Sequence, residues 1–327
     1  DRHMISKFRI GALVIILNFF ASVAMIWGQD NPSLLQMAVP SLNIAPDARG
    51  GGMGDMGAAT LPDINSQYWN AAKYAFMGSK AGVSLSYTPW LRKLVNDVAL
   101  VNMTGYYKLG NSDLQAISAS LRYFSLGEVN IWENIGDVPY GLNPYEMAFD
   151  VAYSRKLSES YSMAVTLRYI RSDMGTDQND ESNAGNAFSA DISGYLEKYV
   201  LMGNAEALWS FGFNLSNIGS KISYDGGNTN QYLPAKLTLG TGLLYPIDDY
   251  NQIGVYLDLN KYMVPYAPQK EEGETDADYQ TRVDDYKSWS SLSGMLKSFT
   301  DSPNGLLKEI MVSVGAESVS YTHLTLP

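Results

Sequence analysis

The chain has 327 residues and a formal net charge of −11, and 46% of its residues are hydrophobic and 12% aromatic. This composition is too apolar for a disordered chain, and the excess of acids disfavours nucleic acid, whose phosphates require a surplus of Lys and Arg. There is no cysteine, and the two histidines are His3 and His323. Disulfides and thiol catalysis are therefore excluded, and we expect no histidine base, no metal site and no cofactor in the body of the chain.

The first 28 residues have the pattern of a secretory signal peptide. Lys7 and Arg9 precede an apolar stretch, residues 10–26, which gives way to small and polar residues at Gly28 and Gln29. A basic start, an apolar centre and a small-residue end are typical of a leader that is cleaved near Gly28. A single membrane anchor is the alternative, because the stretch is long enough to span a bilayer.

Residues 29–78 carry few strand signals but contain a dense glycine-rich motif. Residues 45–55 read APDARGGGMGD, and residues 68–72 read YWNAA. The backbone of residues 50–54 could cradle a phosphate, since glycines let N–H groups approach an anion. We favour a different interpretation, in which this stretch is a periplasmic or plug segment that folds tightly inside a barrel lumen. The residues expected to lie in the plug or lumen are Asp47, Arg49, Asp55, Trp69 and Asn70.

From residue 79 onward, apolar and polar residues alternate, which places one set of side chains on each face of a strand. In residues 145–154, for example, Tyr, Met, Phe and Val alternate with Glu, Ala, Asp and Ser. Ten strands are expected, over residues 79–88, 97–109, 114–126, 145–154, 161–169, 186–198, 207–218, 232–246, 252–262 and 306–319.

The lengths of the connections favour a transmembrane barrel over a soluble β-sandwich. Short turns at 110–113, 158–160 and 248–251 alternate with long segments at 127–144, 174–185, 219–231 and 263–305. Outer-membrane barrels have short periplasmic turns and long extracellular loops, whereas a sandwich has no reason to sort its loops by length. We therefore predict an all-β, transmembrane antiparallel β-barrel over 79–319, with Phe149 and Val165 pointing outward. Inside it, Asp150 and Arg168 are expected to pair with the N-terminal segment, for example with Arg49 and Asp55.

The longest loop, 263–305, contains two helical patterns and many acidic residues. Thr275 and Asp278 have the spacing of a capping box, and apolar residues follow at helical intervals. A calcium site is conceivable, but EF-hand spacing is missing, so we interpret the acids as a solvated face. The apolar stripes predict either a lid on the barrel mouth or a docking surface for a protein partner. The candidate partner-binding residues are Tyr279, Tyr286, Trp289, Leu292 and Phe299.

Two segments at suitable spacing resemble a known family. They are SLNIAPDARGGGMGDMGAAT at 41–60 and SQYWNAAKYAF at 66–76. Together they resemble the PorV/PorQ family, outer-membrane barrels of the type IX secretion system of Bacteroidetes, and the resemblance extends to Gly315 or Glu317. That family is similar to the FadL fatty-acid transporters, whose barrels have about fourteen strands and an N-terminal plug. The WNAA of residues 69–72 resembles the WNPA motif of such proteins, with Ala71 replacing proline.

The resemblance implies a function in protein secretion and not an enzymatic one. Members of this family take cargo proteins with a C-terminal secretion domain from the translocon and deliver them to the cell-surface sortase for attachment to lipopolysaccharide. The contact surface would then lie on loops 127–144 and 263–305. A FadL-like transporter of hydrophobic small molecules is the alternative. An outer-membrane hydrolase is disfavoured, because the body of the chain lacks the histidine of a Ser/His/Asp set.

The C-terminus departs from the family pattern. After Val319 the chain reads SYTHLTLP and stops. A FadL-like barrel would continue for roughly four more strands, and residues 320–327 lack the terminal aromatic residue of an outer-membrane strand. We therefore expect a C-terminally truncated barrel of about ten strands with an aberrant tail.

Overall fold

The computed structural model describes residues 35–90, 92–93, 97–110, 113–131, 140–175, 184–203, 205–227, 230–302 and 305–320. The expected signal peptide with its cleavage site near Gly28, and the tail beyond Ser320, lie outside the described residues.

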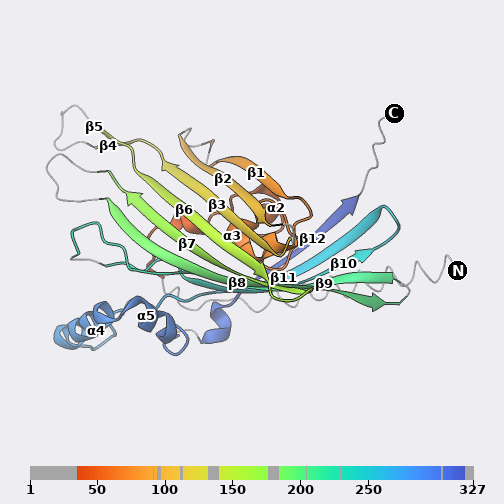
Figure 1. The fold of residues 1–327 in the computed structure, drawn as a ribbon. Helices are drawn as coiled ribbons and strands as arrows, with labels where there is room; N and C mark the ends of the chain where they lie inside the picture. Colours follow the sequence, from red (N-terminus) through yellow and green to blue (C-terminus); the bar gives the residue numbers. More distant parts are fainter. Residues whose placement is uncertain are drawn as a thin grey trace.

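Ten strands form one antiparallel sheet in which each strand pairs with its neighbours in the chain. The strands are β1 (Ala81–Pro89), β2 (Val98–Leu109), β3 (Gln115–Leu126), β6 (Tyr145–Lys156), β7 (Tyr161–Asp173), β8 (Gly185–Met202), β9 (Ala205–Gly219), β10 (Lys236–Pro246), β11 (Asn251–Tyr262) and β12 (Met311–Ser320). The sheet curves strongly, as Figure 1 shows, but β1 and β12 remain its two edges and do not pair. The prediction of an all-β antiparallel sheet of ten strands is thus confirmed, whereas closure into a barrel is not seen.

The two faces of the sheet are inverted relative to a soluble protein. Phe149 and Val165 are 46% and 51% exposed on the convex face. Asp150 and Arg168 point to the other side of the same strands and are buried on the concave face. A water-soluble sandwich would hide its apolar set between two sheets. An apolar exterior around a polar interior is typical of a wall that faces lipid.

Short and long connections alternate as predicted. The turns at 110–114, 157–160, 203–204 and 247–250 are short, and the segments at 90–97, 127–144, 174–184, 220–235 and 263–310 are long. A short hairpin, β4 (Val129–Ile131) and β5 (Tyr140–Leu142), extends from the second long segment. In Figure 1 this hairpin and the helices α4 and α5 lie at the same end of the sheet.

Several strand boundaries differ from the sequence prediction, most clearly those of β8, β9, β10 and β12. β10 begins at Lys236 and not at residue 232, because Pro234 cannot donate to the ladder and Ala235 turns back to bond Leu233 O. β12 begins five residues late, since residues 306–309 form a 3-10 turn, η3 (Leu306–Glu309). β8 and β9 continue through the expected connection at 199–206 and turn at Gly203, whose φ of +67° suits glycine.

Two helices form in the longest loop, α4 (Asp276–Ser288) and α5 (Ser291–Lys297). Thr275 caps α4 by accepting from the N–H of Asp278, as the predicted capping box requires. In the part of the chain that the structure describes, no helix is long and apolar enough to span a bilayer.

The N-terminal segment, which we define as residues 35–80, lies within the curve of the sheet (Figure 1). It contains η1 (Pro40–Asn43), α2 (Ala48–Gly52), α3 (Ser66–Trp69) and η2 (Ala71–Phe76). η2 packs against β6, β7 and β8 through Ala72 and Tyr74, which are fully buried.

Candidate functional site on the concave face and in the longest loop

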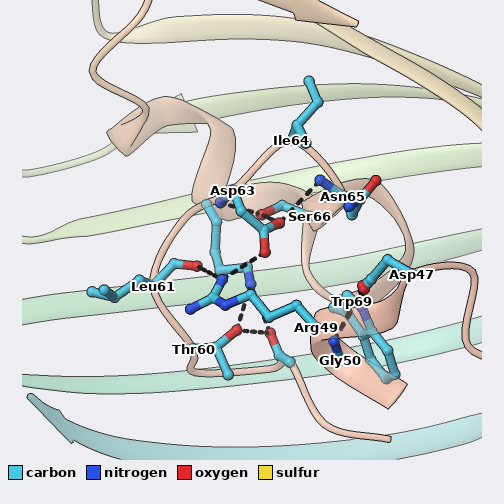
Figure 2. A network of polar contacts seen from close by, with 12 residues as sticks. Asp47, Arg49, Gly50, Thr60, Leu61, Asp63, Ile64, Asn65, Ser66 and Trp69 are labelled. Atoms are coloured by element: carbon cyan, nitrogen blue, oxygen red, sulfur yellow. Dashed lines mark hydrogen bonds and ion pairs between the residues drawn. The ribbon is translucent and has the colours of Figure 1, made fainter. Parts of the chain in front are cut away.

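The glycine-rich motif packs around the ring of Trp69 (Figure 2). The Asp47 carboxylate accepts from Trp69 Nε1 at 3.2 Å and from the backbone N–H of Gly50, which caps α2. A Cβ at Gly50 or Gly57 would lie 2.4 or 2.3 Å from the indole, so these positions require glycine. The N–H groups of Gly50 and Gly54 bond within the segment, which argues against the phosphate cradle considered for this motif.

Arg49 links the N-terminal segment to the last strand of the sheet. Its Nη1 lies 2.6 Å from Asp63 Oδ2, and its Nη2 lies 2.8 Å from Oε1 of Glu317 in β12. Tyr256 of β11 donates to the same Glu317 carboxylate at 2.8 Å. The expectation that Arg49 pairs with Asp150 is wrong, because two acids closer to it in the fold satisfy its guanidinium.

Arg168 is the centre of a separate buried network within the wall. Its guanidinium forms ion pairs with Asp150 at 2.6 Å and with Asp191 at 2.9 Å, and it also donates to Asn217. Asp150 is directly opposite Arg168 in the β6–β7 register, so the two side chains share one face. The expected pairing of Arg168 with Asp55 is therefore wrong, and Asp55 is an exposed residue that follows the glycine-rich helix.

The N-terminal segment is hydrogen-bonded to the strands at its closest approach. Asn70 Nδ2 donates to Ala58 O and to Gly194 O of β8, at 2.8 and 2.9 Å. The Asp258 carboxylate of β11 accepts from the N–H groups of Gly57 and Ala58. Gly212 of β9 and Gly240 of β10 leave room for this approach, since a Cβ at either position would lie within 2.9 Å of an Ala58 atom.

Lys73 of η2 is fully buried beneath this segment. Its Nζ donates to Gly57 O at 2.8 Å and to Thr60 Oγ1 at 3.0 Å. Burial lowers the pKa of Lys73 to about 8, although the nearby Asp63 opposes this shift.

A cavity of about 20 Å³ lies between the N-terminal segment and the sheet. Its lining is mainly polar and charged, and includes Asp55, Arg168, Asn214, Lys236 and Asp258. This volume holds about one water molecule and not an acyl chain. Among the described residues, no group of acidic side chains has the arrangement of a metal site.

The five candidate partner-binding residues fall into two groups. Tyr286 and Trp289 pack edge-to-face, with ring centroids 5.6 Å apart, and Tyr286 also contacts the buried Tyr232 of the preceding loop. These aromatic residues therefore attach the helices to the rest of the molecule. Tyr279 is half-buried on α4, and Leu292 and Phe299 are exposed on α5 and after it.

Some buried polar residues were not among the predicted site residues, although the alternation of the strands indicated their orientation. Asp191 and Asp258 occupy polar positions of alternating strands, so their inward orientation was predictable, although their partners were not. Glu317 occupies such a position on the last strand as well, but its partner is an arginine 268 positions away. Lys73 had no such signal, because it lies in a 3-10 turn.

Comparison with known proteins supports the family resemblance. The family model for the type IX secretion system protein PorV matches residues 28–270, a range that ends just before α4. A comparison with curated protein sequences gives no significant match.

Among solved structures, the chain is similar to OmpT (in-vitro folded), an outer membrane protein of Vibrio cholerae, with 8% identity and a TM-score of 0.35. That match covers 75% of this chain and 62% of the OmpT chain. These values are too low to establish a shared fold. The family match spans most of the sequence, and the chain therefore belongs to the PorV family of type IX secretion system proteins.

Proposed function

We propose that the protein is an outer-membrane component of the type IX secretion system that binds cargo with a C-terminal secretion domain and delivers it to the surface sortase and attachment complex. The observation that carries this proposal is the family match over residues 28–270. The apolar convex face supports a position in the membrane, since Phe149, Val165 and Leu167 are all at least 46% exposed. Lipid and lipopolysaccharide would then surround the wall.

The long-loop end is the proposed contact surface for cargo and sortase. No side chain of α4 is fully buried, and the side of the helix away from Tyr286 is available to a partner. Tyr279 lies on this helix, and Asp284 and Asp285 are exposed beside it. Tyr286 and Trp289 hold the helix in place, so their contribution to cargo binding would be through positioning.

The plug remains a proposal as well. The N-terminal segment fills much of the concave side, and its hydrogen bonds to β8 and β11 hold it there. This filling disfavours the FadL-like alternative, because a carrier of hydrophobic molecules needs an apolar lumen, and the cavity beneath the segment is polar.

The test is co-purification from the native host with the full-length protein as bait. Cargo with a C-terminal secretion domain, or a sortase, should be recovered with the wild type. Replacing residues 276–288 by a Gly/Ser linker of equal length should abolish recovery, whereas D248N/D249N at the opposite, short-turn end should not. If the linker variant and D248N/D249N recover equal amounts of cargo, and circular dichroism shows both sheets folded, the assignment of the contact surface is refuted.

A further inference from the structure

α5 lies against the outward face of the wall and does not cover the lumen. α5 contacts β9, and its buried Met295 belongs to a cluster with Ala235 and Met263. Leu215 and Ile218 of β9 and Leu237 of β10 pack against this cluster. The strand register fixes the side on which these residues lie: Asn214 bonds the N-terminal segment on the concave face, so Leu215 points outward. Leu237 pairs with Leu215 and shares this orientation.

The segment from α5 to η3 also covers Lys261, a charged side chain that points outward. Lys261 of β11 pairs in register with Leu237, and so it also lies on the convex face. Its Nζ is 2.5 Å from Oε2 of Glu309 in η3 and 5.3 Å from the ring centre of Phe299, and the side chain is almost fully buried. An uncovered lysine at such a position would meet hydrocarbon at a high cost. η3 and Phe299 thus neutralise and shield it.

The other side of this segment is apolar and exposed. Leu292, Leu296 and Phe299 are spaced at i, i+4 and i+7, and they are 61%, 66% and 36% exposed. On η3, Leu306 and Leu307 are 40% and 82% exposed. We call these five residues the α5–η3 patch. It adjoins the exposed outward residues of β12 and β11, since η3 leads into β12, where Val312 is opposite Leu259.

The residues around the α5–η3 patch suit the level of lipid headgroups. Trp289 carries Lys297 Nζ 3.7 Å above its ring, and Lys308 is exposed beside Leu307. Tryptophan and lysine are enriched where a membrane protein crosses from hydrocarbon to water. Amphipathic helices that lie in this interface likewise bury leucines toward the acyl chains and turn lysines toward the headgroups.

We propose that α5 and η3 form an interfacial anchor, in which the α5–η3 patch inserts into the outer leaflet beside the wall while Lys297 and Lys308 face lipid phosphates. The proposal rests on the proposed function in one respect, the position of the strands in the outer membrane. It assigns Leu292 and Phe299 to lipid and leaves α4, which is rich in acids, standing off as the protein-binding part of the loop. A protein partner on the same patch is the competing occupant.

Because the chain has no cysteine, single spin labels report on each position without background. The full chain is reconstituted in lipid bilayers with labels at L296C and L307C in the patch, D285C on α4 and L167C at the centre of β7. Power-saturation EPR then compares collisions with oxygen, which partitions into lipid, and with a water-soluble nickel complex. The patch labels should show an oxygen-to-nickel collision ratio several-fold above that of D285C, approaching that of L167C.

Each other outcome has a definite meaning. Patch labels that collide with nickel as often as D285C, with L167C still in lipid, would overturn the anchor and leave the membrane location intact. Patch labels that are shielded from both reagents would show protein covering the patch and would also overturn it. A water-exposed L167C would instead refute the proposed membrane location.

Discussion

Arg168 of β7 and Asp150 of β6 are register partners that form a two-point ion pair, with Nε–Oδ1 at 2.6 Å and Nη2–Oδ2 at 3.1 Å. Both side chains are nearly inaccessible to solvent, and Asp191 binds the other edge of the same guanidinium. The network joins three neighbouring strands on the concave face. Removing one member of such a buried network leaves the other charges without a partner. Water cannot solvate them there, so the loss destabilises the fold.

We therefore predict that R168M destabilises the protein by about 3–5 kcal/mol, since it leaves Asp150 and Asp191 as uncompensated buried acids. Thermal unfolding in detergent, followed by circular dichroism, measures the loss. R171A is the matched control, because Arg171 lies on the same strand in a more exposed ion pair of 3.8 Å and should cost only ~0–1 kcal/mol. Equal losses in both variants would contradict the prediction.

The approach of the N-terminal segment to β9 gives a second prediction. A Cβ at Gly212 would lie 1.9 Å from Ala58 O, a backbone atom that cannot rotate away. G212A should push residues 57–60 off the sheet, at a cost of about 1–3 kcal/mol, and accelerate hydrogen exchange there. G52A, where a Cβ meets open space, is the control and should exchange as the wild type does.

The ten strands were predictable from the sequence because alternation and turn residues are local signals. The direction of Phe149 and Asp150 followed from the same alternation. The partners of Arg49 and Arg168 were not predictable in this way, since a charge facing the interior meets several acids and only the fold decides between them. Asp63 and Glu317 follow Arg49 by 14 and 268 positions, and no spacing rule connects them with it.

The position of α5 was also not predictable from the sequence. The stripe of Leu292, Leu296 and Phe299 was visible in the sequence, but an apolar stripe does not reveal which surface it faces. The register of Leu215 and Leu237 determines that α5 lies on the outer wall. This information depends on strand pairing and is not contained in residues 291–297.

A third prediction concerns α4, which has no fully buried side chain and so depends strongly on local interactions at its ends. Thr275 Oγ1 accepts from the Asp278 N–H at 3.2 Å, and losing this cap costs a helix about 1 kcal/mol. T275A should accelerate hydrogen exchange in residues 276–281 without lowering the unfolding temperature of the sheet. T281A, an exposed change within the same helix, should leave exchange as slow or slower, because alanine favours helix.

The last prediction concerns the buried Lys73, whose pKa is lowered to about 8 in the folded protein by its removal from water. In the unfolded chain the ammonium has a pKa near 10.4. Below pH 8 both states are charged, so the folded state bears the full cost of the buried charge. Between pH 8 and about 10.4 the unfolded state holds more protons than the folded state, and the free energy of unfolding therefore rises with pH. The rise attributable to Lys73 is on the order of 3 kcal/mol.

K73M isolates this contribution, since it keeps an unbranched side chain that is one atom shorter and removes the titrating group. The measurement is the free energy of unfolding in detergent as a function of pH from 7 to 10.5, compared between wild type and K73M. The absolute stability of K73M also reflects the loss of the hydrogen bonds to Gly57 O and Thr60 Oγ1, so the informative quantity is the slope with pH. The difference between the two curves should change across this window and level off at its ends. Parallel curves would show that Lys73 titrates normally and that water reaches η2 beneath the N-terminal segment.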